Sequence, residues 1–222
     1  MTKTIKAKLR ILSIEEIANT ISHGLGLVLS LAGFVALVVL AGLRGNPVLV
    51  AGCVVYGMSL VVLYAASTMY HSATSPKAKK TLQVVDHCCI YLLIAGSYTP
   101  FGLVIAGDSF GRGLLAAIWG FAFVGIVTKL IIGARFPAIN VISYLIMGWL
   151  GVFAVQPLFN ALGMMPVALT IAGGVAYTLG VVFFPWKSIK HHHAIFHVFV
   201  LAGSILHYIA VAVYVVPYSE NL

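Results

Sequence analysis

The sequence predicts an all-α integral membrane protein, a bundle of seven transmembrane helices with its amino terminus in the cytoplasm. Hydrophobic residues make up 61% of the 222 residues and charged residues only 8%, which excludes an ordinary soluble fold. Gly and Pro divide the apolar sequence into seven stretches of about 20 residues or more, the length that a membrane-spanning helix needs. These stretches are continuously apolar, whereas the strands of a membrane barrel alternate polar and apolar residues.

The expected helices are residues 19–43, 48–71, 83–107, 110–132, 138–158, 164–185 and 193–216. Three parts of the chain follow: a cytoplasmic amino-terminal segment over 1–18, a membrane domain over 19–216 and a short extracytoplasmic tail over 217–222. The first part is too polar for a cleavable signal peptide, so we expect the first helix to act as its own insertion signal.

The distribution of basic residues predicts the orientation. All but two of the 13 Lys and Arg residues fall in the amino-terminal segment or are counted with the second, fourth and sixth loops, Lys129 being counted with the fourth although it stands near the end of the expected helix 110–132. These are Lys3, Lys6, Lys8, Arg10, Lys77, Lys79, Lys80, Lys129, Arg135, Lys187 and Lys190. The two exceptions are Arg44 and Arg112. Because Lys and Arg collect in cytoplasmic loops, this places the amino terminus inside and the carboxyl terminus outside. The net charge of +8 then reflects topology and does not indicate a nucleic-acid partner.

The first helix begins with a capping signal. In Ser13-Ile14-Glu15-Glu16 the Ser13 hydroxyl can accept from the Glu16 amide while the Glu16 side chain reaches back, as in a capping box. Both glutamates also fall in the first turn, where they favour the helix dipole. A second interpretation has Glu15 or Glu16 reach a site at the cytoplasmic mouth of the bundle.

Side chains that can bind metals gather at the cytoplasmic ends of the second, third and seventh helices. They are Ser67, His71, Asp86, His87, His193 and His197. Ionisable groups inside a membrane helix are costly and are seldom found there without a partner or a function. Asp86 is the one acid well inside an expected helix, so we interpret this end as a functional site.

The spacing of the histidines indicates a zinc site. His193 and His197 stand four residues apart and so project from one helix face. We predict Zn²⁺ bound by these two and His71, with a water as fourth ligand held by Asp86. Three protein ligands with one open position are typical of catalytic zinc. Ser67, one turn before His71, could orient the water or a substrate carbonyl.

Other side chains have less definite roles. Glu16, His23 and His87 are candidates for outer contacts to the metal ligands, and each could equally be structural. His191 and His192 can be read as solvated loop residues, and His207 lies deep in the seventh helix without an evident partner. A simpler alternative is that all the histidines only form hydrogen bonds at the membrane interface.

The remaining sequence is interpreted as packing. We expect Pro100 to kink the third helix and Pro157 the fifth. Cys53, Cys88 and Cys89 are expected to be small buried residues, since their spacing suits neither a disulfide framework nor a metal knuckle. Nine glycines are expected to let helices approach closely. They are Gly96, Gly102, Gly120, Gly125, Gly148, Gly151, Gly173, Gly174 and Gly180.

Together the motifs resemble the bacterial hemolysin III family, especially its small enterobacterial inner-membrane members. The matching segments are 15–19 (EEIAN), 22–26 (SHGLG), 67–71 (STMYH), 86–87 (DH), 90–100 (IYLLIAGSYTP) and 193–197 (HAIFH). The resemblance runs from about residue 13 to 216 and extends to the progestin and adipoQ receptors and the alkaline ceramidases. It implies an inner-membrane seven-helix bundle with a zinc held by His71, His193 and His197, and with Asp86 holding the zinc-bound water.

The function expected from this resemblance is hydrolysis of a lipid amide or ester, because the site in the ceramidase and adiponectin-receptor relatives is linked to lipid amide hydrolysis. The alternative is a membrane-homeostasis sensor or a cytolytic protein with a structural zinc. A membrane lipid is the expected partner, while its identity and the oligomeric state stay open. A di-iron desaturase would need more histidine ligands, and a retinal protein would need a lysine in the seventh helix. A G-protein-coupled receptor would have the opposite topology.

Overall fold

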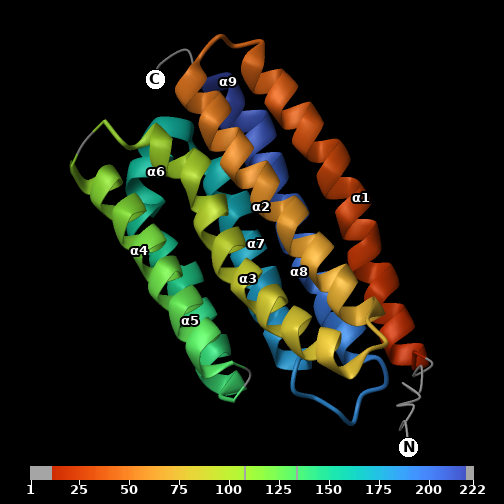
Figure 1. Ribbon diagram of the computed structural model, residues 1–222. Coiled ribbons are helices and arrows are strands. Elements are labelled where there is room, and N and C mark those ends of the chain that lie inside the picture. Colours follow the sequence, from red (N-terminus) through yellow and green to blue (C-terminus); the bar gives the residue numbers. More distant parts are fainter. Residues whose placement is uncertain (1–11, 108, 134, 219–222) are drawn as a thin grey trace, which may run out of the picture.

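The computed structural model describes residues 12–107, 109–133 and 135–218, and in these ranges it contains helices and no strands. Seven helical spans are long and apolar enough to cross a membrane, as predicted. The helices are α1 (Ile14–Gly42), α2 (Pro47–Ser72), α3 (Pro76–Val104), α4 (Ser109–Ile132), α5 (Pro137–Trp149), α6 (Val155–Leu162), α7 (Met164–Phe183), α8 (His192–Ala210) and α9 (Val216–Tyr218). The bundle is elongated, with all spans running roughly along its length (Figure 1).

Two spans are interrupted. In the fifth, a 3₁₀ segment, η1 (Leu150–Ala154), joins α5 to α6, and Pro157 lies in the first turn of α6. Pro157 has no backbone N–H to offer that segment, which agrees with the loss of regular α-helical bonding just before it. In the seventh span a π-helical segment, η2 (Val211–Val215), joins α8 to α9. Pro100 lies inside α3, and the helix continues to Val104.

The start of α3 was predicted too late. The helix begins at Pro76 and not at residue 83, so Lys77, Lys79 and Lys80 belong to its first turns and not to a loop. The apolar-run criterion misses this segment because it is polar. Proline is nevertheless favoured at the first helical position, where its missing N–H costs nothing.

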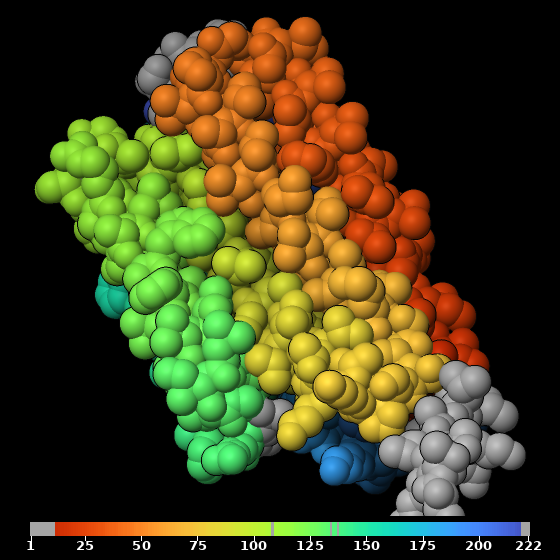
Figure 2. All heavy atoms as spheres, viewed as in Figure 1, coloured from red at the N-terminus to blue at the C-terminus, as the bar shows by residue number. Residues whose placement is uncertain are grey.

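The bundle has one main apolar core between α1, α2, α3 and the seventh span. Helix α2 packs along both α1 and α3, and α7 packs along α8. On the face drawn in Figure 2, α2 and α3 lie in continuous contact between α1 and α4. Gly96 lets α3 approach Ser59 of α2, where a side chain would overlap the serine hydroxyl. Gly120 and Gly148 have open space around them, so the expected packing role is wrong for these two. Cys53, Cys88 and Cys89 are buried free thiols, as predicted.

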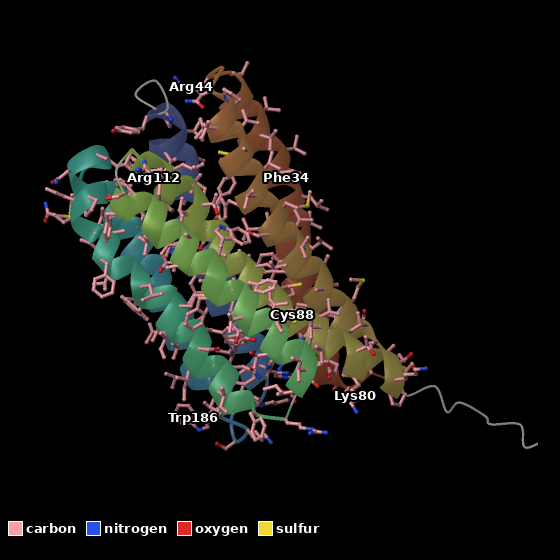
Figure 3. All side chains as sticks on the ribbon, turned by 60° about the vertical axis from the view of Figure 1, so that its left-hand side comes forward. Phe34, Arg44, Lys80, Cys88, Arg112 and Trp186 are labelled. Atoms are coloured by element: carbon pink, nitrogen blue, oxygen red, sulfur yellow. The ribbon has the colours of Figure 1, made fainter. Side chains whose placement is uncertain are left out.

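The connections divide between two ends of the bundle. The loops joining α2 to α3, α4 to α5 and α7 to α8 lie at the end that also holds the first residues of α1 (Figure 1). We call this the basic end, because it carries Lys77, Lys79, Lys80, Arg135, Lys187 and Lys190. Arg44 and Arg112 lie at the opposite end, away from Lys80 (Figure 3). Lys3, Lys6, Lys8 and Arg10, and most of the expected tail, lie outside the described residues.

One basic residue departs from this division. Lys129 belongs to the last turn of α4, and only 1% of its surface is exposed, so counting it as a loop residue was wrong. Its place in the sequence, close to the end of an apolar run, gave no sign of burial.

Candidate metal site

Three histidines come together at the basic end. His71 lies in the last turn of α2, and His193 and His197 lie in the first two turns of α8. Their potential ligand atoms all lie within 4.8 Å of one another, so the three could hold one metal ion. His71 and His197 are almost completely buried, at 3% and 2% exposure. The three imidazoles predicted to bind a metal therefore lie in one place.

The hydrogen bonds of these rings leave nitrogens available for a metal. Nδ1 of His71 lies 2.7 Å from Oε2 of Glu16, and its Nε2 is buried with no hydrogen-bond partner among the described residues. Nδ1 of His197 lies 3.0 Å from the Ser22 hydroxyl, which leaves Nε2 as the nitrogen that could bind. A buried polar atom without a partner costs about 1–3 kcal/mol, and a bound cation would remove that cost. The residues present fit a metal that accepts three imidazoles.

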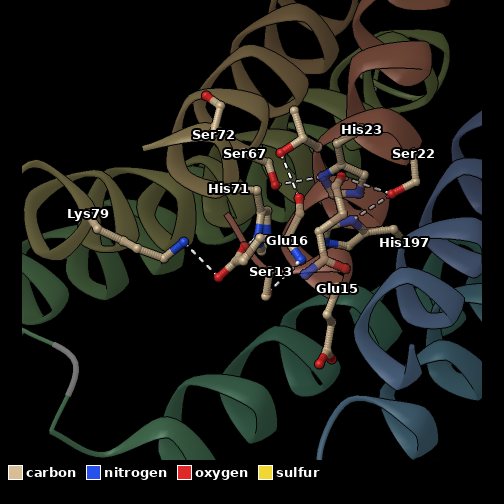
Figure 4. A network of polar contacts seen from close by, with 12 residues as sticks. Ser13, Glu15, Glu16, Ser22, His23, Ser67, His71, Ser72, Lys79 and His197 are labelled. Atoms are coloured by element: carbon tan, nitrogen blue, oxygen red, sulfur yellow. Dashed lines mark hydrogen bonds and ion pairs between the residues drawn. The ribbon is translucent and has the colours of Figure 1, made fainter. Parts of the chain in front are cut away.

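Glu16 is the link between the cluster and the first turns of α3. One carboxylate oxygen meets His71, and the other lies 2.6 Å from Nζ of Lys79 (Figure 4). The predicted capping box is therefore half correct: the Ser13 hydroxyl accepts from the Glu16 amide at 3.2 Å, but the Glu16 side chain turns away. Charge-assisted bonds to a histidine and a lysine are stronger than a bond to a backbone amide. A carboxylate on the far nitrogen of a ligating histidine orients the ring and raises its basicity.

His23 lies directly against the cluster. Its ring stacks on that of His197, with centroids 3.4 Å apart and planes inclined by 15°. Its Nδ1 lies 2.6 Å from the hydroxyl of Ser67, and its Nε2 is buried without a hydrogen-bond partner in the described chain. The structure thus places His23 beside the three histidines.

Ser67 and Asp86 continue this contact toward α3. The Ser67 hydroxyl bonds Nδ1 of His23 and also lies near the Asp86 carboxylate, with which it interacts. A serine hydroxyl can donate one hydrogen bond and accept others, so it can connect the two groups. The result is a polar chain from α1 through α2 to α3, adjacent to the three imidazoles.

His87 and His207 each form one hydrogen bond outside the cluster, while Nδ1 of His207 has no hydrogen-bond partner among the described residues. Nδ1 of His87 bonds the carbonyl of Gln83 within α3, so this ring is engaged locally. His207 was expected to lack a partner, which is wrong: its Nε2 lies 3.0 Å from the carbonyl of Thr170 on α7. A helix–helix contact of this kind cannot be seen in the sequence of one helix.

Of the two histidines before the cluster, His192 is in contact with other groups. Nε2 of His192 lies 3.4 Å from Oε1 of Glu15, and its Nδ1 faces the carbonyl of Phe183. His191 precedes α8 in the left-handed backbone conformation, with φ at 59°. His192 is therefore less solvated than a free loop residue.

Two partners were not predicted from the sequence: Ser22, which contacts His197, and Lys79, which contacts Glu16. A signal for the first helix was present, because Glu16, Asn19 and His23 are spaced as one helix face and mark a polar stripe on an apolar segment. No comparable signal connects Lys79 to Glu16, since that contact depends on where α3 begins.

Comparisons with known proteins agree with this architecture. A family model described as "Haemolysin-III related" matches residues 12–208. The chain is 42% identical to "Hemolysin-3" of Bacillus cereus over 203 residues, covering 91% of this chain and 93% of that protein. It is 42% identical to the "Hemolysin-3 homolog" of Bacillus subtilis (strain 168), covering 91% and 95%. A more distant similarity is to "Monocyte to macrophage differentiation factor" of Homo sapiens, at 31% identity over 71% of this chain and 67% of that protein.

Proposed function

The chain belongs to the haemolysin-III related family, and we propose that it is a zinc-dependent membrane hydrolase that cleaves an amide or ester bond of a lipid. The observation that carries the proposal is the cluster of three imidazoles with ligand atoms within 4.8 Å of one another. Three protein ligands leave the fourth position of a tetrahedral zinc open, as in catalytic zinc sites. A site that was only structural would be closed by a fourth ligand.

His71, His193 and His197 would hold the metal, with Glu16 and Ser22 fixing two of the rings through Nδ1. When bound, zinc would supply a water whose pKa is lowered toward about 7 and would polarise the carbonyl of the bond to be cleaved. The side chains of the protein would then orient the imidazole rings, accept a proton from the water and return it to the leaving group.

Asp86 is the group we propose for proton transfer. Its carboxylate accepts a proton from the attacking water and gives it to the departing amine or alkoxide. In this proposal Ser67 would donate to the carboxylate and His23 would donate to Ser67, because the Ser67 hydroxyl contacts His23 and lies near Asp86. In this proposal Asp86 is not a metal ligand. A change at Asp86 would therefore impair proton transfer and leave the metal bound.

We also propose that the protein resides in the inner membrane with the basic end facing the cytoplasm. The unequal distribution of Lys and Arg between the two ends supports this orientation. The site would then lie near the boundary between membrane and water. Acyl chains would reach it from the bilayer and water from the cytoplasm.

A second candidate is a cytolytic or sensing protein in which the metal only ties helices together. The observation that favours it is the name of two relatives, "Hemolysin-3" and "Hemolysin-3 homolog". In that case the metal would join α2 to α8, and no lipid would be cleaved.

The test of the hydrolase is release of free fatty acid from a total bacterial lipid extract by the zinc-loaded protein in lipid nanodiscs, measured by mass spectrometry. Wild type is compared with Asp86→Asn and with Glu15→Gln, a matched change at an acid outside the polar chain. We expect release by wild type and by Glu15→Gln, and at least about 100-fold less by Asp86→Asn with its metal retained. Full release by Asp86→Asn would contradict the role of Asp86. No release by wild type carrying one zinc would favour the second candidate.

A further inference from the structure

Lys129 is a charged residue that the proposed reaction does not yet use. It lies in the last turn of α4 with 1% of its surface exposed. Among the described residues it forms no hydrogen bond and no ion pair within 4 Å. A buried charge within a membrane span is costly and is usually retained for a function or by a partner charge. A partner charge near the Lys129 ammonium group is therefore expected.

Contacts between α3 and α4 place the residue. Near the opposite end, Nε1 of Trp119 donates to the Thr99 hydroxyl at 3.2 Å. One to two turns closer to the basic end, Gly125 lies against the ring of Tyr91, with no room for a side chain. The two helices run antiparallel. Lys129 is in the next turn of α4 after Gly125, so the same register places it opposite the part of α3 just before Tyr91.

That part of α3 carries Cys88, His87 and Asp86. Of these three residues Asp86 is the acid, so its carboxylate and the Lys129 ammonium group attract each other across the contact between α3 and α4. Asp86 also lies near Ser67 of α2. The carboxylate therefore has a hydroxyl from α2 and an ammonium group from α4 in its surroundings.

We propose that Lys129 is a positioning residue, whose ammonium group compensates the carboxylate of Asp86 inside the membrane and holds it against Ser67 beside the three histidines. Helix α4, which contributes no metal ligand, thereby becomes part of the site. The catalytic meaning of this pairing rests on the proposed function. The pairing itself does not, because it can be measured without substrate or metal.

A different explanation is that Lys129 only interacts with the carboxyl-terminal dipole of α4, which favours a positive charge in the last turn. The two explanations differ in one measurable respect. Compensation makes the effects of changing Lys129 and Asp86 depend on each other, whereas a dipole effect leaves them independent.

The test is a double-mutant cycle on thermal unfolding of the full chain in detergent. It uses Lys129→Met, Asp86→Asn and the double variant, with Lys129→Arg as the conservative rescue and Lys80→Met as the matched change at an exposed lysine. We expect Lys129→Met to lower the midpoint by roughly 5–10 °C, as for a buried pair that loses one partner. The double variant should lose clearly less than the sum of the two single changes. Lys129→Arg should recover most of the loss, and Lys80→Met should change little.

Additive losses in the double variant, or an unchanged midpoint in Lys129→Met, would overturn the proposal. If Lys129→Met cannot be purified, recovery of folded protein in the double variant supports the pairing, and failure to recover it overturns the pairing. Because the cycle involves neither metal nor substrate, additive losses leave the hydrolase proposal intact. A coupled pair in a protein that binds no zinc would remove the hydrolase alone.

Discussion

Two buried polar clusters in the same bundle differ in whether their polar atoms have hydrogen-bond partners. In the tyrosine cluster (Tyr64, Tyr177 and Ser204), the hydroxyls of both tyrosines lie 2.9 Å from the Ser204 hydroxyl. In the histidine cluster (His71, His193 and His197), Nε2 of His71 is buried without a partner among the described residues. Most buried polar groups are hydrogen-bonded, and Nδ1 of His207 is another exception among the described residues. At the histidine cluster, however, the free nitrogen lies within 4.8 Å of the ligand atoms of two further imidazoles, which supports the proposed metal site.

Side chains of α1 orient the imidazole rings of the histidine cluster. It contributes none of the three histidines, yet it supplies Glu16 to His71, Ser22 to His197, and His23 as the ring stacked on His197. These contacts fix ring orientation and decide which nitrogen stays free. In the tyrosine cluster the hydroxyls bond directly to one another across α2, α7 and α8.

The largest expected effect that would sharpen this contrast comes from Glu16→Gln. Glutamine can still bond Nδ1 of His71 but supplies no negative charge, so metal affinity should fall by roughly 10–100-fold. Competition with a chelator of known affinity measures the change. Glu15→Gln, one residue away, is the control and should retain the affinity of wild type. Equal affinity in both variants would mean that Glu16 serves only the packing of α1 and Lys79.

A smaller effect, on stability and not on metal binding, is expected from Ser204→Ala. Removing this hydroxyl leaves two buried tyrosine hydroxyls without their shared partner, which should cost about 1–3 kcal/mol of unfolding free energy. Bound metal should stay at the level of wild type, because the tyrosine cluster has no part in binding it. Chemical unfolding in detergent and metal analysis of the same sample give both numbers. Loss of metal here would show that the two clusters are not independent.

The sequence predicted what depends on local patterns. Seven apolar stretches became seven spans, because span length and apolar composition are properties of each segment alone. His193 and His197 share a face because helical periodicity dictates it. Membrane-buried ionisable groups also pointed correctly to one end of the bundle, since their cost makes them conspicuous in an apolar sequence.

What the sequence did not predict depends on which helices meet. The hydrogen-bond partner of His207 is on another helix, and so is the carboxylate that we propose as the partner of Lys129. Glu16 was expected to cap its own helix, but tertiary packing brought His71 and Lys79 within reach and the stronger bonds formed. The start of α3 was misplaced because its first turns are polar and lie outside the apolar run.

The most direct test of the central claim is the metal content of protein purified in detergent after growth with zinc, measured by elemental mass spectrometry. Wild type is compared with His71→Ala and with His207→Gln, a partly buried histidine outside the cluster. The account predicts one zinc per chain in wild type and in His207→Gln, and almost none in His71→Ala. Wild type without bound metal, or His71→Ala with as much zinc as wild type, would contradict it.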